Sequence, residues 1–176
     1  MLNTMPSKQE AIAAESFQVY ISKADDTDVV KAIRRNTKEF RKLLKSIPGK
    51  KRNYAYAEGK WTIQELLQHI IDAERVFVYR ALTFARNDRS SLPGFDENSW
   101  AAQANKTSRR WKDLVKEFET VRAGSELFFE SLNDEELLFT GNANNNPANA
   151  LALGYVVAGH AKHHLLIIKE RYLKKS

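Results

Sequence analysis

Apolar residues recur at three- and four-residue spacing in four long segments of the chain, which is the periodicity of helices that each bury one face. The first segment runs from about Asp28 to Ser46, and Pro48-Gly49 stops it. Proline and glycine both interrupt helical periodicity, so the pattern predicts a single amphipathic helix here. Its apolar series is Val29, Val30, Ile33, Phe40, Leu43, Leu44 and Ile47.

The second segment opens with a helix-capping signal. Thr62 is followed three residues later by Glu65, the pairing of a capping box, in which each side chain binds the backbone of the other residue. The spacing predicts a helix from this cap to about residue 84. Its series is Ile63, Leu66, Leu67, Ile70, Ala73, Phe77, Arg80, Ala81 and Phe84.

The third and fourth segments are separated from their neighbours by turn-forming residues. The third is predicted to start near Ser108, after a connector over residues 87–107 that contains Pro93-Gly94. The fourth is predicted over Ala148–Leu173, after polar turn material at residues 141–147. The series of the third segment is Trp111, Leu114, Val115, Phe118, Val121, Leu127, Phe128 and Leu132.

Four long helices joined by loops of this size predict an all-α fold, an antiparallel four-helix bundle. A chain of 176 residues with 43% hydrophobic residues can bury the core that one such domain needs. We place the bundle domain at residues 25–176 and treat residues 1–24 as an N-terminal extension or short helix.

The composition limits the chemistry that the chain can perform. It has no cysteine, which excludes disulfides and thiolate ligands, so a metal would have to be bound by His, Asp or Glu. The N-terminus lacks a basic start followed by an apolar run, and no uninterrupted apolar stretch reaches membrane-spanning length. We therefore expect a soluble, cytoplasmic protein without a membrane partner.

All four histidines fall on the second and fourth predicted helices. His160 and His164 are four residues apart, so their side chains lie one above the other on one helix face. His69 lies among apolar positions that face the core. Together these three can form a three-nitrogen metal site with open coordination positions, which is typical of catalytic sites.

Spacing alone leaves a plainer interpretation open. A histidine on an apolar face is more often a hydrogen-bonded core residue, and two histidines four apart also occur by chance. His163 could replace His164, but neighbouring residues on a helix diverge by about 100°. Ala161 stands where a zincin protease carries its glutamate base, which argues against that class.

Longer stretches of the sequence resemble a known family. The run Gly59 to Arg75 (GKWTIQELLQHIIDAER) is similar to a signature of the DinB-like superfamily, and Gly159 to His164 (GHAKHH) resembles its second signature. The segment Leu92 to Asp96 and the ending Lys169 to Tyr172 also resemble one branch of the family. The resemblance implies a four-helix bundle with a divalent metal ion on His69, His160 and His164.

The resemblance also implies what such an ion would do. Characterised relatives include metal-dependent transferases that use low-molecular-weight thiols such as bacillithiol, mycothiol or glutathione. An open site would bind the thiol sulfur and lower its pKa, and the partner molecules would be a small thiol or an electrophile. A metal-dependent hydrolase and a non-catalytic binding module remain alternatives. Zinc, nickel, iron and manganese all suit three imidazoles, and the resemblance suggests a homodimer.

Two further features have competing interpretations. Asp72 could orient the His69 ring, or it could be a helix carboxylate paired with Arg75. Lysines and arginines crowd the first predicted helix, and the chain carries a net charge of +6, which suits a phosphate-binding face. They occupy the polar positions of that helix as any solvated face would, so we expect no nucleic-acid partner.

Overall fold

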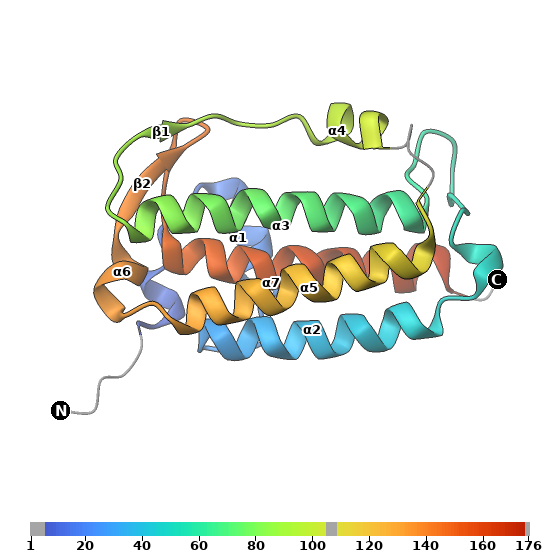
Figure 1. Ribbon diagram of the computed structural model, residues 1–176, viewed down its shortest axis with the longest axis horizontal. Helices are drawn as coiled ribbons and strands as arrows, with labels where there is room; N and C mark the ends of the chain where they lie inside the picture. The colour runs from blue at the N-terminus through green and yellow to red at the C-terminus, as the bar shows by residue number, and fades with distance from the viewer. Residues whose placement is uncertain (1–5, 105–108, 175–176) are drawn as a thin grey trace.

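Four long helices form the body of the computed structural model, which describes residues 6–104 and 109–174 (Figure 1). The predicted four-helix bundle is therefore confirmed. The predicted start of the third helix near Ser108 lies outside the described residues. The four helices are α2 (Val29–Ser46), α3 (Ile63–Ala85), α5 (Trp111–Glu130) and α7 (Ala150–Ile167).

The four long helices run in two opposite directions, as the paths of their connections require. Figure 1 shows that α2 and α7 run one way and that α3 and α5 run the other way. The antiparallel neighbours are α3 with α7 and α2 with α5. The long helices α3 and α5 are parallel, because the connector that joins them runs back along α3 to the end where α3 began.

Side-chain caps set the starts of the helices. The capping box predicted at Thr62 is present: its hydroxyl accepts from the Glu65 amide at 3.2 Å, and Glu65 Oε2 accepts from the Thr62 amide at 2.6 Å. Asp28 caps α2. Asn149 caps α7 by accepting from the Ala152 amide at 2.9 Å, so the fourth helix begins at Ala150 rather than at the predicted Ala148.

A small sheet replaces the turn predicted over residues 141–147. Strands β2 (Thr140–Ala143) and β3 (Asn146–Asn149) form an antiparallel hairpin, and β1 (Ser91–Leu92) pairs with β2 in parallel. Asn144 and Asn145, at the tip, both have positive φ, of 53° and 60°. Asparagine tolerates this conformation, which two-residue hairpin loops require, so the polar run is a hairpin signal that the prediction missed.

The connector after α3 is more ordered than its turn-forming residues suggested. It contains β1 and the helix α4 (Glu97–Ala104), and Figure 1 shows it passing over α3. A further short helix, α6 (Asp134–Leu138), follows α5. The chain between α3 and α5 therefore covers one side of the bundle.

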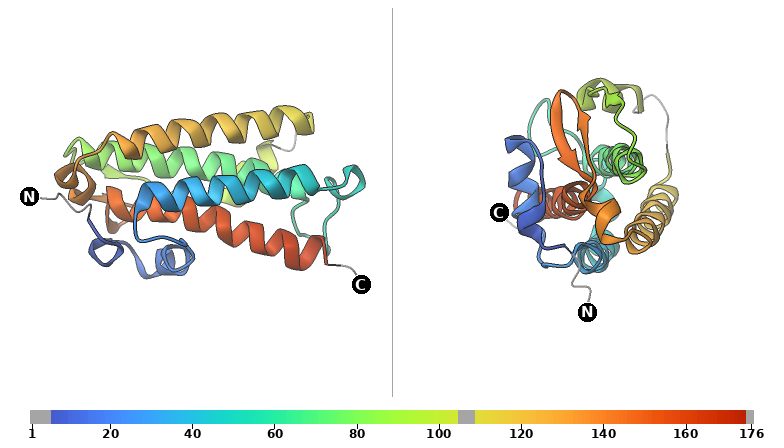
Figure 2. Two further views of the ribbon diagram at one scale, coloured as in Figure 1. Left: turned by 90° about the horizontal axis from the view of Figure 1, so that it is seen from below. Right: turned by 90° about the vertical axis from the view of Figure 1, so that its left-hand side faces the viewer.

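The N-terminal segment, of which residues 6–24 are described, packs along α7. It contains a 3-10 turn, η1 (Lys8–Glu10), and the helix α1 (Glu15–Ile21). Figure 2 shows α1 beside α7, with the hairpin between α1 and α3 at one end of the bundle. Gly159 permits this approach, because a Cβ atom built there would lie 1.8 Å from the Tyr20 carbonyl oxygen.

Helix α7 is the central element of the fold. All its residues from Ala150 to Ala161 are buried, and a π-helical turn, η3 (Ile168–Tyr172), extends it. The span Ala150–Tyr172 is long and apolar enough to cross a membrane, but 78% of its most apolar window is buried inside the bundle. Burial of this kind is typical of a core helix.

The buried face of α5 differs from its predicted apolar series. Leu127 is 67% exposed, whereas Phe129 and the charged Arg122 are completely buried. Arg122 Nε lies 2.8 Å from Glu74 Oε2 on α3, and its Nη2 donates to the Val157 carbonyl on α7 at 3.1 Å. Charged residues are rarely buried without a partner, so a polarity pattern alone could not place this one in the core.

We predict that Gly159→Ala lowers the free energy of unfolding by about 1–3 kcal/mol, because the added methyl group would displace the α1 backbone. Gly124→Ala is the matched control, since Gly124 lies in a helix with nothing near its Cβ position. That control should gain about 0.5–1 kcal/mol from helix propensity. Urea denaturation measures both, and equal effects would contradict the close contact.

We predict that Arg122→Met lowers the free energy of unfolding by about 3–5 kcal/mol, because it leaves the buried Glu74 carboxylate without a counter-ion. Adding Glu74→Leu should recover most of this loss, since an apolar pair leaves no uncompensated charge. Denaturation of the single and double variants tests the pair. A double variant as unstable as the single one would show that packing, rather than charge, carries the effect.

Candidate metal centre

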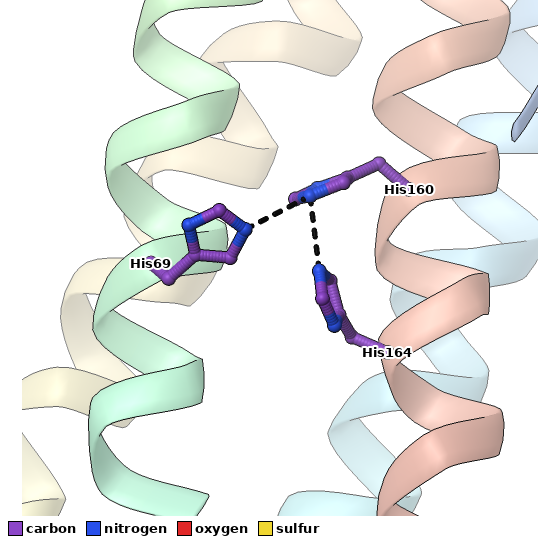
Figure 3. Close-up of side chains that lie close together, drawn as sticks. All are labelled: His69, His160 and His164. Carbon is purple, nitrogen blue, oxygen red and sulfur yellow. Dashed lines mark hydrogen bonds between the residues drawn. The ribbon is translucent and has the colours of Figure 1, made fainter. Parts of the chain in front are cut away.

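Three histidines from two helices converge on one point (Figure 3). His69 comes from α3, and His160 and His164 come from one face of α7. The Nε2 atom of His160 lies 3.1 Å from Nε2 of His69 and 3.0 Å from Nε2 of His164. The structure therefore brings together the three histidines that the sequence singled out.

The spacing of these nitrogens fits a shared metal ion better than a hydrogen-bonded cluster. A neutral ring nitrogen carries either one hydrogen or one lone pair, so His160 Nε2 cannot form a full hydrogen bond with both neighbours. Nitrogens that bind one ion at about 2.0–2.1 Å are themselves about 3.0–3.4 Å apart. The three imidazoles could thus hold a divalent cation.

Burial keeps the three imidazoles in the form that binds metals. Desolvation lowers the pKa of His69 to about 4, opposed by the charge of Glu97. It also lowers the pKa of His160 and of His164 well below the usual value, and the neighbouring histidines add to this effect. All three rings are therefore neutral near pH 7, with a lone pair available to a cation.

His163 and Asp72 lie outside this cluster. The half-buried His163 ring packs edge-on against Tyr20, with centroids 5.5 Å apart. Asp72 accepts from Gln68 Nε2 at 2.9 Å and lies 3.7 Å from Arg75 Nη1. No described contact joins Asp72 to His69. Of the two roles considered for Asp72, the contacts support the helix carboxylate paired with Arg75 and not the group that orients His69.

The indole of Trp61 supports the His69 ring from the side. The two ring centroids are 4.8 Å apart, and the Trp61 carbonyl accepts from the Tyr172 hydroxyl at 2.5 Å. Burial raises the pKa of that tyrosine to about 12, which keeps the hydroxyl protonated as a donor. The turn that extends α7 thus helps to fix Trp61, and Trp61 in turn packs against the His69 ring.

The three imidazoles form part of the wall of a cavity of about 280 Å³. A cation on these nitrogens would therefore have coordination positions open to a small molecule. The other walls come from α1, the segment just before α3, α3 itself, the connector after it and the hairpin tip. They are formed by Phe17, Tyr20, Trp61, Ala73, Phe77, Arg80, Gly94, Phe95, Glu97 and Asn144.

Several of these wall residues escaped the sequence analysis. Phe17 and Tyr20 belong to α1, to which the analysis gave no role, and Asn144 belongs to the unpredicted hairpin. Arg80 carried a visible signal, because it is a charged residue within an apolar series. The functional walls therefore come largely from segments whose position depends on tertiary packing.

Comparison with known proteins places this geometry in a family context. The model of the DinB superfamily matches residues 32–168. A candidate metal-dependent hydrolase of Oceanobacillus iheyensis is 30% identical over 146 residues, which cover 80% of this chain and 81% of that protein. Another from Geobacillus kaustophilus is 24% identical over 139 residues, covering 77% of each chain.

A solved structure shares the fold. YfiT from Bacillus subtilis, described as a probable metal-dependent hydrolase with an unusual four-helix bundle topology, matches with a TM-score of 0.68. The match covers 96% of this chain and 91% of YfiT at 13% sequence identity. At this identity the likeness supports the fold and not the reaction.

We predict that His69→Ala, His160→Ala and His164→Ala each weaken binding of a divalent ion by at least about tenfold, because each removes a ligand. His163→Ala is the matched control and should keep full metal content, since its ring lies outside the cluster. Elemental mass spectrometry after loading and dialysis measures the content. Equal loss in all four variants, or loss in none, would contradict the three-histidine site.

Proposed function

Because the chain belongs to the DinB superfamily, we propose that it is a metal-dependent hydrolase of small molecules. The observation that carries the proposal is the convergence of three neutral imidazole nitrogens in the wall of an open cavity. The relatives from Oceanobacillus and Geobacillus, both named as candidate metal-dependent hydrolases, support it. His69, His160 and His164 would hold the ion.

A divalent cation held there would polarise a carbonyl or phosphoryl oxygen and lower the pKa of a bound nucleophile such as water. The protein's own contribution begins with the fixed positions of the three rings. His160 and His164 share one rigid helix, and the indole of Trp61 confines His69. Little rearrangement of these side chains is then needed when a substrate enters.

Glu97 is the proposed acceptor of the proton that the nucleophile gives up. Its side chain lines the cavity together with His69 and Tyr20, where its negative charge partly opposes the lowering of the His69 pKa by burial and adds to the raised pKa of Tyr20. Asp96 fixes the start of α4 by accepting from the amides of Asn98 and Ser99 at 3.0 Å. This turn holds Glu97 at the cavity mouth, where it can pass a proton to solvent.

Tyr20 is the proposed hydrogen-bond donor to the substrate. Burial, and secondarily Glu97, raises the pKa of its hydroxyl, which therefore stays protonated at neutral pH. A neutral phenol can donate to an oxygen that gains negative charge during the reaction. The apolar side chains Phe17, Phe77 and Phe95 limit the water around that oxygen, which strengthens such a bond.

Thiol transfer is the second candidate, and the same apolar walls favour it. They suit an electrophile with an alkyl or aryl group and would shield a thiolate from water. The chain has no cysteine, so the thiol would have to be a separate small molecule. Water and thiol would compete for the same open positions, and a direct assay distinguishes them.

The basic surface of α2 gives little support to a nucleic-acid-binding role. Arg34 on α2 pairs with Glu130 at 2.8 Å, and Arg41 pairs with Glu119 at 2.7 Å. Carboxylates of α5 thus neutralise part of the α2 surface, which weakens the attraction that a phosphate backbone would feel.

We predict that the protein loaded with zinc, nickel, iron or manganese hydrolyses members of an ester, amide and phosphoester panel. Chelation should abolish turnover, and Glu97→Gln should lower kcat by about 10²–10⁴-fold without loss of metal, because it removes the proton acceptor. The protein loaded with each of these ions is also assayed for thiol transfer, with alkyl and aryl electrophiles and either glutathione or bacillithiol.

Glu135→Gln is the matched control, since Glu135 is exposed on α6 away from the cavity. It should keep full turnover. Turnover that appears only with an added thiol would favour the transferase over the hydrolase. Fully loaded protein that is inactive with water and with thiols would overturn both and leave a binding module.

A further inference from the structure

Arg80 is a buried cation in the cavity wall, and none of the described residues gives it an acidic partner. Its side chain lines the cavity, and the residue is only 4% exposed. Its Nη2 donates to the Pro93 carbonyl at 2.8 Å, and no carboxylate pairs with it in the described parts of the chain. A buried guanidinium held by one neutral acceptor is costly, so the site favours an additional negatively charged ligand.

The position of Arg80 relates it directly to the histidine cluster. His69, Ala73, Phe77 and Arg80 follow one another on α3 at intervals of four, four and three residues, so they lie on one helix face. All four line the cavity. Helical side chains lean toward the N-terminus of their helix, which for Arg80 is the direction of His69. The cavity thus has histidines at one end and a cation farther along.

A second polar side chain, that of Asn144, lines the same cavity. The Asn144 side chain, at the hairpin tip, reaches Gly94, the residue after the Pro93 carbonyl that Arg80 binds. A Cβ atom on Gly94 would lie 2.4 Å from Asn144 Oδ1, so this approach depends on glycine. The amide of Asn144 can donate to the same anion as the guanidinium.

Other cationic surfaces of the molecule lack these properties. The groove on α2 is lined by Arg34, Lys38, Lys42 and Lys45, and it also contains Glu126. Its cations are solvated, and Arg34 already pairs with Glu130. Burial lowers the pKa of Arg80, and no described carboxylate counteracts this effect. Among these candidates, Arg80 combines burial, a missing counter-ion and a place in the cavity.

We infer that Arg80, assisted by Asn144, binds an oxyanion group of the substrate. The substrates are then small molecules that carry a carboxylate or phosphate at a distance from the bond that reacts. The inference rests on the proposed function. Phe77 lies between His69 and Arg80 on α3, and the Phe95 ring lies next to Arg80. These apolar walls suit an apolar linker between the two groups of the substrate. Arg80 is then a specificity residue and takes no part in the bond-breaking step.

The test uses hydroxamic acids, which bind metal ions, with a short alkyl chain that ends in a carboxylate, a phosphonate or a neutral carboxamide. Calorimetry measures the Kd of each probe with the nickel-loaded full-length protein. At least one anionic probe should bind about tenfold more tightly than the carboxamide, the ratio expected for one charge-assisted hydrogen-bonded contact. The preferred anion identifies the carboxylate or the phosphate as the source.

Two variants and a control separate recognition from folding. Arg80→Gln keeps a donor for Pro93 but removes the charge, so the preference for the anionic probe should fall to within about twofold. Asn144→Gly keeps a residue that tolerates positive φ and should reduce the preference partly. Arg86→Gln is the matched control: Arg86 lies at the C-terminal end of the same helix, is exposed and pairs with Glu136, so its loss should leave the preference unchanged.

A purely structural Arg80 would lower the affinity of all probes equally and leave their ratio intact, and that result would overturn the inference. The neutral probe reports separately on the metal site. If it binds only when nickel is present but no anion improves binding, the proposed function stands and the inference fails. If nickel does not bind, glutarate and glutaramide are compared on the metal-free protein, and equal affinities would then overturn the inference.

Discussion

The arrangement of the site depends on one buried ion pair. Arg122 of α5 contacts Glu74 of α3 and the backbone of α7 at Val157, and Ser125 donates to Glu74 at 2.7 Å. Glu74 lies five residues after His69, and Val157 lies three residues before His160. Such pairs add little net stability, but an alignment of the helices that separated the two groups would leave a buried charge without its partner. The pair therefore sets how far α3 can slide against α7, and with it the distance between their histidines.

The cavity is a product of the chain's path. Because α3 and α5 are parallel, the intervening connector must return along α3, and it carries Phe95 and Glu97 to the open side of the histidines. On the opposite side, Gly159 lets α1 approach α7 closely enough for Tyr20 to reach the cavity. Helices carry the three histidines, and the segments between and before the helices enclose the cavity.

The sequence was informative wherever a signal is local. Apolar periodicity located the four long helices, the Thr62 capping box marked the start of α3 to the residue, and four-residue spacing paired His160 with His164. It was uninformative where a partner lies far along the chain. Arg122 is buried where Glu74 of another helix faces it, and Leu127 is exposed because none of the described helices covers it. A local signal that the prediction missed is the pair of asparagines at the hairpin tip, which suit the positive φ of a two-residue hairpin loop.

The division of labour between α7 and the covering segments has a consequence for how such a protein can diversify. Helix α7 contributes two of the candidate metal ligands while its side chains fill the centre of the core, so a substitution at this pair must suit both the packing and the proposed coordination. The connector and the hairpin tip face the same cavity from the protein surface and carry no such double demand. Changes in the connector and the hairpin tip, with the helices unchanged, are therefore the simplest route to a different substrate range, both in evolution and in protein engineering.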